Sequence, residues 1–96
     1  MHILSKSRLR EFWEVHPPAK GPMEAWHAVV ERAAFTCFAD VPNTYNSADQ
    51  VGDAIVFNVN SYRIVASVRY LARRVFISHV FTHAECEKWS KAQRKK

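Results

Sequence analysis

Residues 62–71, YRIVASVRYL, largely alternate between apolar and polar side chains. Because successive side chains of a strand point to opposite faces, this alternation is typical of a β-strand with one buried face. Strand-like runs on either side cover residues 54–59 and 74–81, and Asn60-Ser61 provides a two-residue hairpin in which Asn tolerates a positive φ. The sequence therefore predicts a three-stranded antiparallel meander.

Helical patterns precede the meander. The short apolar stretch MHIL predicts a first strand, and Ser5 or Ser7 is expected to cap a helix that ends before Pro17. The apolar positions of this helix are Leu9, Phe12, Trp13 and His16. A second helix is expected to begin at Gly21-Pro22. Its apolar stripe consists of Met23, Trp26, Val30 and Ala33.

The remaining segments complete the predicted fold. Residues 36–52 are rich in Asn, Ser, Pro and Gly, which predicts a loop with one helical turn near residues 39–45. Thr82 and Glu85 match the capping-box pattern and predict the start of a last helix, which leads into a basic, frayed tail over residues 88–96. We therefore expect one α+β domain over residues 1–96, in the order β-α-α-β-β-β-α, with helices on one face of an antiparallel sheet and the other face partly open.

Charge and cysteine content narrow the class of protein. The chain has 96 residues, a net charge of +5 and a sequence pI near 9.6. A small basic domain attracts polyanions, among which nucleic acid is common, although many such domains bind an acidic protein instead. No signal peptide or membrane span is evident, and the two cysteines, Cys37 and Cys86, do not suggest a disulfide framework. We expect a cytoplasmic protein that does not bind membranes.

The predicted hairpin places Asn58 opposite Arg63 on the open face. If the second and third strands of the meander are joined by two or four residues, the same face also carries Ser67, Arg69 and Ser78, with Thr82 and His83 at its rim. That parity places His79 beneath the helices as a hydrogen-bonded core histidine. A three-residue loop would reverse this placement.

Two residues of this face suggest chemistry. Arg63 lies in mid-strand with few carboxylates nearby, which suits a phosphate ligand; the simpler alternative is a surface arginine that lies over the sheet. His83 is either an exposed residue of the first helical turn or a proton donor or acceptor, and the helix N-terminus favours its neutral form. A zinc site of His79, His83 and Cys86 is disfavoured because no fourth ligand follows in paired spacing. We predict no metal and no cofactor.

Five segments resemble a known family. The stretches LREFWEVHPPA, SADQVGD, IVFNV, YRIVA and VFISHVFTHAE occur in the order expected for the HigB family of bacterial toxin–antitoxin systems, in the RelE-like superfamily. The resemblance implies a RelE-like fold and a toxin that cleaves messenger RNA during translation on the ribosome, without a metal, by attack of a 2′-hydroxyl on the adjacent phosphate. It also implies neutralisation by a helix-turn-helix antitoxin, HigA, whose complex with the toxin represses its own operon.

The resemblance assigns roles to individual residues. The family's strand arginine falls on Arg63, which would hold the phosphate, and its histidines fall on His83, a general acid or base, and on His79. With Asn58 as an orienting group, the candidate catalytic residues are Arg63, His83, Asn58 and His79. The candidate RNA-binding residues, which would hold flanking phosphates, are Arg69, Arg74, Lys88 and Lys91.

The sequence also departs from the family pattern, which leaves two alternatives open. The hairpin before Arg63 is shorter than in the family, Ser78 replaces a frequent arginine, and Cys86 replaces a frequent tyrosine. The chain could therefore be a catalytically weak module that binds the antitoxin and represses transcription. A gyrase inhibitor of the ParE type is the other alternative, because fold alone does not fix function.

Overall fold

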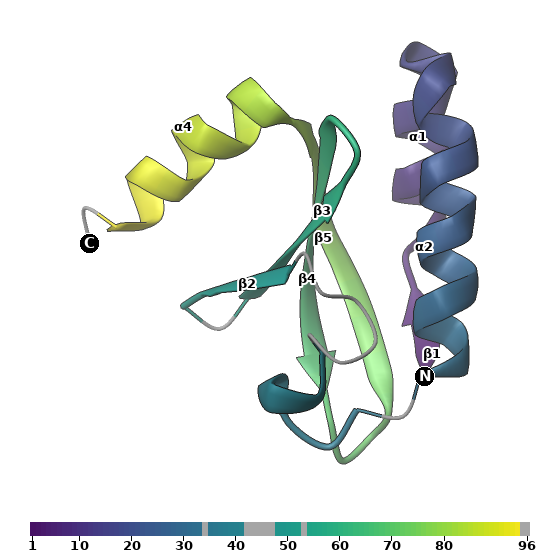
Figure 1. The fold of residues 1–96 in the computed structure, drawn as a ribbon, viewed down its shortest axis with the longest axis vertical. Coiled ribbons are helices and arrows are strands. Elements are labelled where there is room, and N and C mark those ends of the chain that lie inside the picture. Colours follow the sequence, from purple (N-terminus) through teal and green to yellow (C-terminus); the bar gives the residue numbers. More distant parts are fainter. Residues whose placement is uncertain (34, 42–47, 53, 95–96) are drawn as a thin grey trace.

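The computed structural model describes residues 1–33, 35–41, 48–52 and 54–94 (Figure 1). Its helices are α1 (Lys6–Val15), α2 (Lys20–Arg32) and α4 (His83–Arg94), with 3-10 turns η1 (Pro17–Ala19) and η2 (Phe38–Asp40). Its strands are β1 (His2–Leu4), β2 (Ala48–Val51), β3 (Ala54–Val59), β4 (Tyr62–Arg69) and β5 (Arg74–Thr82). The predicted helices and meander are therefore present, and residues 88–94, expected in a frayed tail, lie within α4.

The five strands form one sheet in the order β1-β5-β4-β3-β2. The prediction of a wholly antiparallel sheet is wrong, because β1 pairs in parallel with β5 while the other neighbours are antiparallel. The predicted element order also lacked β2, which lies in the segment expected to be a loop. Val51 pairs with Ala54 across a turn that includes Gly52 at a φ of 60°, a conformation open to glycine. Most of the helical turn expected near residues 39–45 lies outside the described residues.

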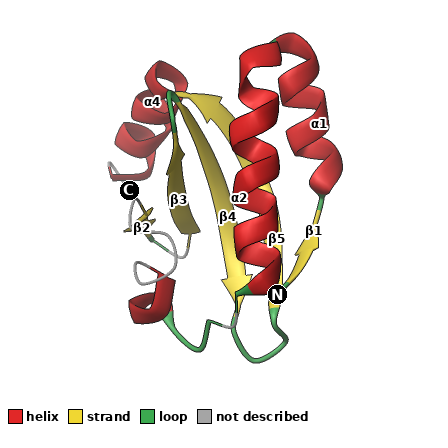
Figure 2. Cartoon of the chain, turned by 45° about the vertical axis from the view of Figure 1, so that its right-hand side comes forward, coloured by secondary structure: helices red, strands yellow, loops and turns green. Residues whose placement is uncertain are grey.

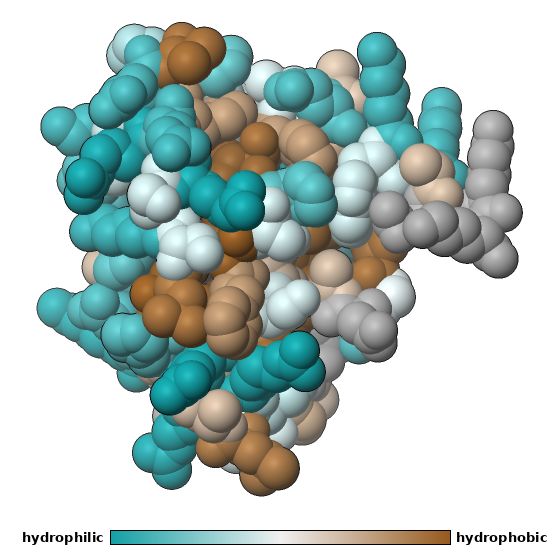
Figure 3. Space-filling view, turned by 180° about the vertical axis from the view of Figure 1, so that it is seen from behind, coloured by the Kyte–Doolittle hydropathy of each residue, from teal (hydrophilic) through white to brown (hydrophobic). Residues whose placement is uncertain are grey.

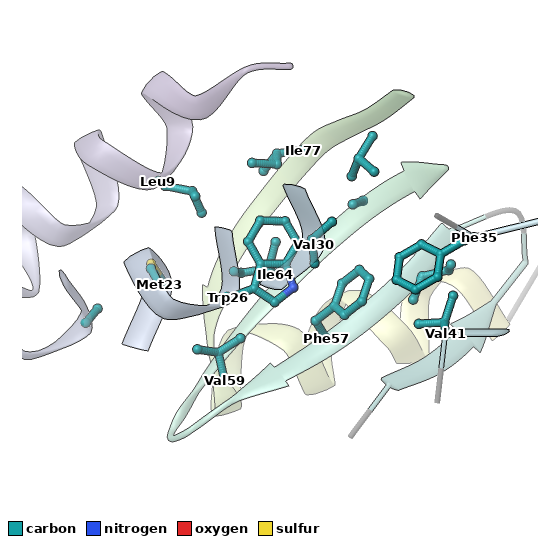
Figure 4. Close-up of a cluster of buried hydrophobic side chains, with 14 residues drawn as sticks. Leu9, Met23, Trp26, Val30, Phe35, Val41, Phe57, Val59, Ile64 and Ile77 are labelled. Atoms are coloured by element: carbon teal, nitrogen blue, oxygen red, sulfur yellow. The ribbon is translucent and has the colours of Figure 1, made fainter. Parts of the chain in front are cut away.

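The two N-terminal helices cover one face of the sheet (Figure 2). Helix α1 starts after Ser5, whose φ of 67° is left-handed and whose side chain makes no capping hydrogen bond. It ends before Pro17, as predicted, and η1 leads directly into α2. Helix α2 begins at Lys20, two residues before Pro22, the predicted first helical position. Helices and sheet bury one main core (Figure 4). Its largest buried side chains include Leu9, Met23, Trp26, Val30, Phe57 and Ile64.

The opposite face of the sheet is partly covered by α4. Figures 1 and 2 show α4 on the side of the sheet away from α1 and α2. Cys86 of α4 packs with Val56 of β3 and Val65 of β4, and Phe81 and Trp89 flank this second cluster. The prediction that all helices lie on one face is therefore wrong. The remaining open part of this face is narrower than expected and is bordered by α4.

A β-bulge changes which side chains of β5 face α4. Arg69 pairs with Arg74 across a four-residue connection, but the register shifts between Val65 and Ala66, so that Val65 pairs with His79 and Ala66 with Ile77. Ser78 is the extra residue of the bulge. Because side chains alternate strictly along a strand, one extra residue reverses the face of every residue beyond it. His79 therefore faces α4 with Val65, and its predicted position beneath α1 and α2 is wrong.

Hydrophobic side chains reach the surface at separate places. Seen from behind, hydrophobic patches lie between hydrophilic side chains (Figure 3). The largest exposed apolar side chains are Val15, Val29, Leu71 and Phe76. Among the described residues, none of the helices has the length and apolar character that crossing a membrane requires.

Candidate active site

The β3–β4 hairpin brings Asn58 and Arg63 together. Asn58 pairs directly with Arg63 in the antiparallel register, and Asn60 has a φ of 55°, as a two-residue hairpin requires. Direct cross-strand partners project to the same face with Cβ atoms about 5 Å apart. The predicted arrangement of these two residues is confirmed.

A capping box positions His83 at the start of α4. The backbone N–H of Thr82 donates to Oε1 of Glu85 (3.1 Å), and the backbone N–H of Glu85 donates to Oγ1 of Thr82 (3.4 Å). The hydrogen bond from the Thr82 backbone, with a further one from its side chain, lowers the pKa of Glu85 below its ordinary value. The predicted capping box is thus formed, and it fixes His83 in the first turn, where the chain passes from β5 to α4.

Arg63 and His83 are in direct contact. Nη2 of Arg63 lies 2.6 Å from Nδ1 of His83, and Nη1 of Arg63 donates to the carbonyl oxygens of Tyr62 (2.8 Å) and Asn60 (3.1 Å). A guanidinium has only donors, so Nδ1 of His83 is the acceptor in this contact. The tautomer that fits the contact carries its proton on Nε2, which donates to Oε1 of Glu87 at 3.0 Å. The hydrogen bonds therefore place Nδ1 of His83, a nitrogen that can accept a proton, beside the positive charge of Arg63.

A hollow of about 450 Å³ opens in front of this pair. It is lined by Asp49, Gln50, Val51, Val56, Asn58, Arg63, His83 and Cys86. Strand β2, which the prediction missed, supplies one wall with Asp49 and Gln50. The signal for β2 was the pair Gly52-Asp53 before an apolar strand, a combination that often marks a tight hairpin turn. Glu87 was also missed, although it lies four residues after His83, the spacing at which helical side chains meet.

The predicted RNA-binding residues divide into two groups. Lys88 and Lys91 are exposed on α4, the helix that carries His83. Arg69 and Arg74 are exposed partners at the far end of β4 and β5. Arg69 is six residues from Arg63 along β4, which corresponds to about 20 Å. The structure therefore places the lysines on the helix that carries His83, and the arginines at the opposite end of the hairpin formed by β4 and β5.

His79 is exposed on the α4 side of the sheet and does not belong to the lining of the hollow. Its Nδ1 lies 3.2 Å from Oγ of Ser78, which itself donates to the Val65 carbonyl (3.1 Å) at the bulge. The ring stacks on Phe81, with centroids 5.1 Å apart and planes at 19°. Of the four candidate catalytic residues, three line the hollow and His79 stands apart.

Cys86 is a packing residue in this structure. Its side chain is buried against Val56 and Val65, although one surface lines the hollow. Within residues 1–33, 35–41, 48–52 and 54–94, no three His, Cys, Asp or Glu side chains are grouped so that they could hold a metal ion. The combination of His79, His83 and Cys86, which the ligand spacing already disfavours as a zinc site, is not among such groups in these residues.

These features define a class of protein: an α+β fold in which an arginine and a histidine that contact each other line a hollow of the sheet surface. The family model described as HigB toxin, the RelE-like toxic component of a toxin–antitoxin system, matches residues 19–89. The match covers well over half of the chain, and the chain belongs to this family. The five-stranded mixed sheet is compatible with a RelE-like fold.

A curated relative supports the same family assignment. The chain is 23% identical to the mRNA interferase HigB of Escherichia coli O6:H1 (strain CFT073) over 99 residues, covering 98% of this chain and 96% of the relative. The chain is thus similar to that protein over nearly its whole length. The predicted family is confirmed, and membership of it implies an antitoxin partner.

Proposed function

We propose that this toxin is an endoribonuclease that cleaves messenger RNA on the ribosome by attack of a 2′-hydroxyl on the adjacent phosphate. The observation that carries the proposal is the 2.6 Å contact between Nη2 of Arg63 and Nδ1 of His83. This pair puts a positive charge and a proton acceptor at one place, and the reaction needs both. The similarity to an mRNA interferase supports the same activity.

Arg63 is the proposed phosphate ligand. Its guanidinium is held by two backbone carbonyls and by His83, so its direction is set before substrate binds. A guanidinium forms paired hydrogen bonds with phosphate oxygens, and its charge offsets the negative charge that builds up on phosphorus. Nη2 has a second N–H that can donate to a phosphate, and Nδ1 of His83 becomes available as a base once its contact with Arg63 opens.

His83 is the proposed general base. Its Nδ1 takes the proton of the 2′-hydroxyl while the 2′-oxygen bonds to phosphorus. The bond from phosphorus to the 5′-oxygen breaks, and the leaving oxygen takes a proton from water, giving a cyclic phosphate and a 5′-hydroxyl. The proton held by His83 then neutralises the hydroxide that is left. Oε1 of Glu87 accepts a hydrogen bond from the Nε2–H of His83, which fixes the tautomer and orients the ring. The protein groups alone account for the proton transfer from the attacking hydroxyl.

The remaining site residues are proposed to orient RNA. Asn58 lines the hollow opposite Arg63, where its side chain can direct a ribose or phosphate oxygen. Lys88 and Lys91 would hold flanking phosphates, which contribute affinity without reading sequence. Arg69 and Arg74 would contact phosphates farther along the messenger RNA or in ribosomal RNA.

The antitoxin partner is proposed to be a helix-turn-helix protein of the HigA type. Support comes from the family assignment, which makes this chain the toxic half of a pair. The neighbouring gene tests this directly: it should encode a helix-turn-helix protein whose co-expression suppresses the toxicity of this chain.

Mapping the 5′ ends of messenger RNA after induction in cells tests the activity. We expect new ends positioned by codons with the wild-type chain and none with Arg63→Ala, while Arg10→Ala, an exposed arginine of α1, behaves as wild type. Toxicity without new ends would favour gyrase inhibition. The absence of both toxicity and cleavage would leave a module that only binds the antitoxin.

A further inference from the structure

Three aromatic rings form a cluster on the α4 side of the sheet that the proposed mechanism does not use. His79 and Phe81 of β5 are stacked at 5.1 Å, and Trp89 of α4 lies 5.8 Å from His79 and 6.2 Å from Phe81, by ring centroids. The rings differ in exposure to solvent. Phe81 and Trp89 are half-buried, whereas His79 is exposed. The stack therefore runs from the second core cluster outward and ends on a ring that faces solvent.

The cluster lies close to the proposed phosphate ligand. Phe81 pairs directly with Arg63 in the register of β4 and β5, so their side chains leave the same face side by side. His79 is the next residue of β5 on that face and is a diagonal neighbour of Arg63, at about 7–8 Å. A phosphate held by Arg63 and a base placed on His79 could therefore belong to the same nucleotide or to adjacent ones.

A second hollow adjoins the cluster and shares His79 and Phe81 with it. It measures about 340 Å³ and lies between α1 and β5. Its lining residues are Arg8, Glu11, Phe12, Ser78, His79, Val80 and Phe81. Glu11 disfavours a phosphate inside the hollow, whereas Arg8 attracts one nearby, so the flat uncharged base is the part of a nucleotide that fits.

The β-bulge supports a functional reason for this arrangement. Without the extra residue Ser78, His79 would face α1 and α2, and the stack on Phe81 could not form. Bulges recur beside active sites, where they redirect a side chain. Here the bulge turns a histidine out of the core and onto an aromatic surface beside the site.

We propose that His79, Phe81 and Trp89 form a stacking platform for a nucleobase next to the cleaved phosphate. The inference rests on the proposed ribonuclease function and gives His79 a binding role in place of the catalytic role implied by resemblance. Aromatic platforms of this kind bind single-stranded RNA with little sequence preference, because every base has a π face.

The decisive variants separate stacking from proton transfer. Messenger RNA cleavage is measured in a purified translation mixture over a range of toxin concentrations. We expect His79→Ala and Trp89→Ala to raise the toxin concentration for half-maximal cleavage by roughly five- to a hundredfold, with an unchanged maximal rate. His79→Phe, which keeps a stacking ring without an ionisable nitrogen, should stay near wild type. Phe76→Ala is the matched control, because Phe76 is a partly exposed aromatic residue of β5 outside the cluster.

Three results would overturn the platform. One is His79→Phe losing as much cleavage as His79→Ala, which would make the imidazole itself necessary. Another is unchanged half-maximal concentrations in both alanine variants. The third is alanine variants that cleave normally but no longer bind the antitoxin, which would assign the surface to a protein partner. Melting temperatures of all variants identify any loss of folding.

Measuring RNA binding tests the platform separately from the proposed cleavage activity. If the wild-type chain does not cleave at all, the proposed function fails, and the platform is tested with a 2′-O-methyl RNA oligonucleotide, which has no attacking hydroxyl. Bound RNA should quench tryptophan fluorescence, and Trp89→Phe should remove the quenching while keeping the affinity. Quenching that persists in Trp89→Phe, or no binding at all, would refute the platform.

Discussion

Nη2 of Arg63 donates to Nδ1 of His83 at 2.6 Å, so the proposed phosphate ligand and the proposed base are hydrogen-bonded to each other. The contact joins β4 to the first turn of α4. Nη1 already donates to the carbonyl oxygens of Asn60 and Tyr62, so a phosphate would be bound by the second N–H of Nη2 and by the Nε–H. Because Nδ1 is occupied in this contact, His83 can take a proton only once the hydrogen bond from Arg63 opens.

Replacing Arg63 by lysine tests the need for a guanidinium. Lys keeps the charge but loses the planar pair of donors and the fixed contact with His83. We expect the maximal cleavage rate to fall by roughly 10²–10³-fold, with little change in melting temperature. Arg10→Lys is the matched control. A lysine variant with near wild-type cleavage would show that charge alone is sufficient.

Replacing His83 by glutamine tests the proposed base. Glutamine can still accept a hydrogen bond from Arg63 but cannot take a proton from a hydroxyl. Cleavage should be abolished, while the melting temperature and antitoxin binding stay nearly unchanged, because the His83 side chain is 59% exposed. Retained cleavage in this variant would remove His83 from the mechanism.

Replacing Glu87 by glutamine should slow cleavage less than the changes at Arg63 and His83. Its contact with Nε2 of His83 is exposed, so the interaction is worth about 0.2–1 kcal/mol and its loss should slow cleavage by roughly two- to fivefold. Glu87→Gln keeps the size of the side chain but weakens the hydrogen bond that orients the His83 ring. Glu24→Gln, an exposed residue of α2, is the control. A cleavage rate equal to that of wild type would show that the Glu87 contact does not contribute to the reaction.

The capping box predicts a pH dependence of stability. The pKa of Glu85 is lowered in the folded chain, chiefly by the Thr82 backbone N–H, so this carboxylate stabilises the fold above its ordinary value of 4.5. That stabilisation is lost as the pH falls through the lowered value. Urea unfolding should show Glu85→Ala less stable than wild type by about 0.5–1 kcal/mol at pH 7, with the difference shrinking towards pH 3. An equal difference at both pH values would contradict this role.

Replacing Cys86 by alanine tests whether its thiol only packs in the core or also takes part in the reaction. Because its thiol is buried with Val56 and Val65, Cys86→Ala should lower the free energy of unfolding by about 1 kcal/mol and leave the cleavage rate intact. Cys37→Ala, at an exposed cysteine, should change neither. Loss of cleavage in a stably folded Cys86→Ala variant would point to a chemical role for the thiol.

The sequence predicted the parts of the fold that depend on local patterns. Alternation placed β4 and a strand-like apolar run placed β3. The Asn60 turn fixed Asn58 opposite Arg63, and the T-x-x-E pattern placed the start of α4. These signals are short-range, since each depends on residues within one hairpin or one helical turn. They were sufficient to predict the positions of Arg63, His83 and Asn58 in their strands and helix.

The parts that were missed depend on contacts distant in sequence. The parallel pairing of β1 with β5 and the packing of α4 on the second face are not encoded by any local period. The position of His79 was wrong because a single bulge residue, Ser78, reverses the parity beyond it. Alternation cannot reveal such an insertion, since Ser78 and His79 are both compatible with either face.

The chemistry of the RNA ends tests the central claim most directly. RNA fragments produced by the purified chain in a translation mixture are examined for their 5′ termini. Attack by a 2′-hydroxyl predicts 5′-hydroxyl ends that become ligatable only after treatment with a kinase, and none of these ends in Arg63→Ala or His83→Gln. Fragments with 5′-phosphate ends, or 5′-hydroxyl ends that persist in both variants, would contradict cleavage by the Arg63–His83 pair.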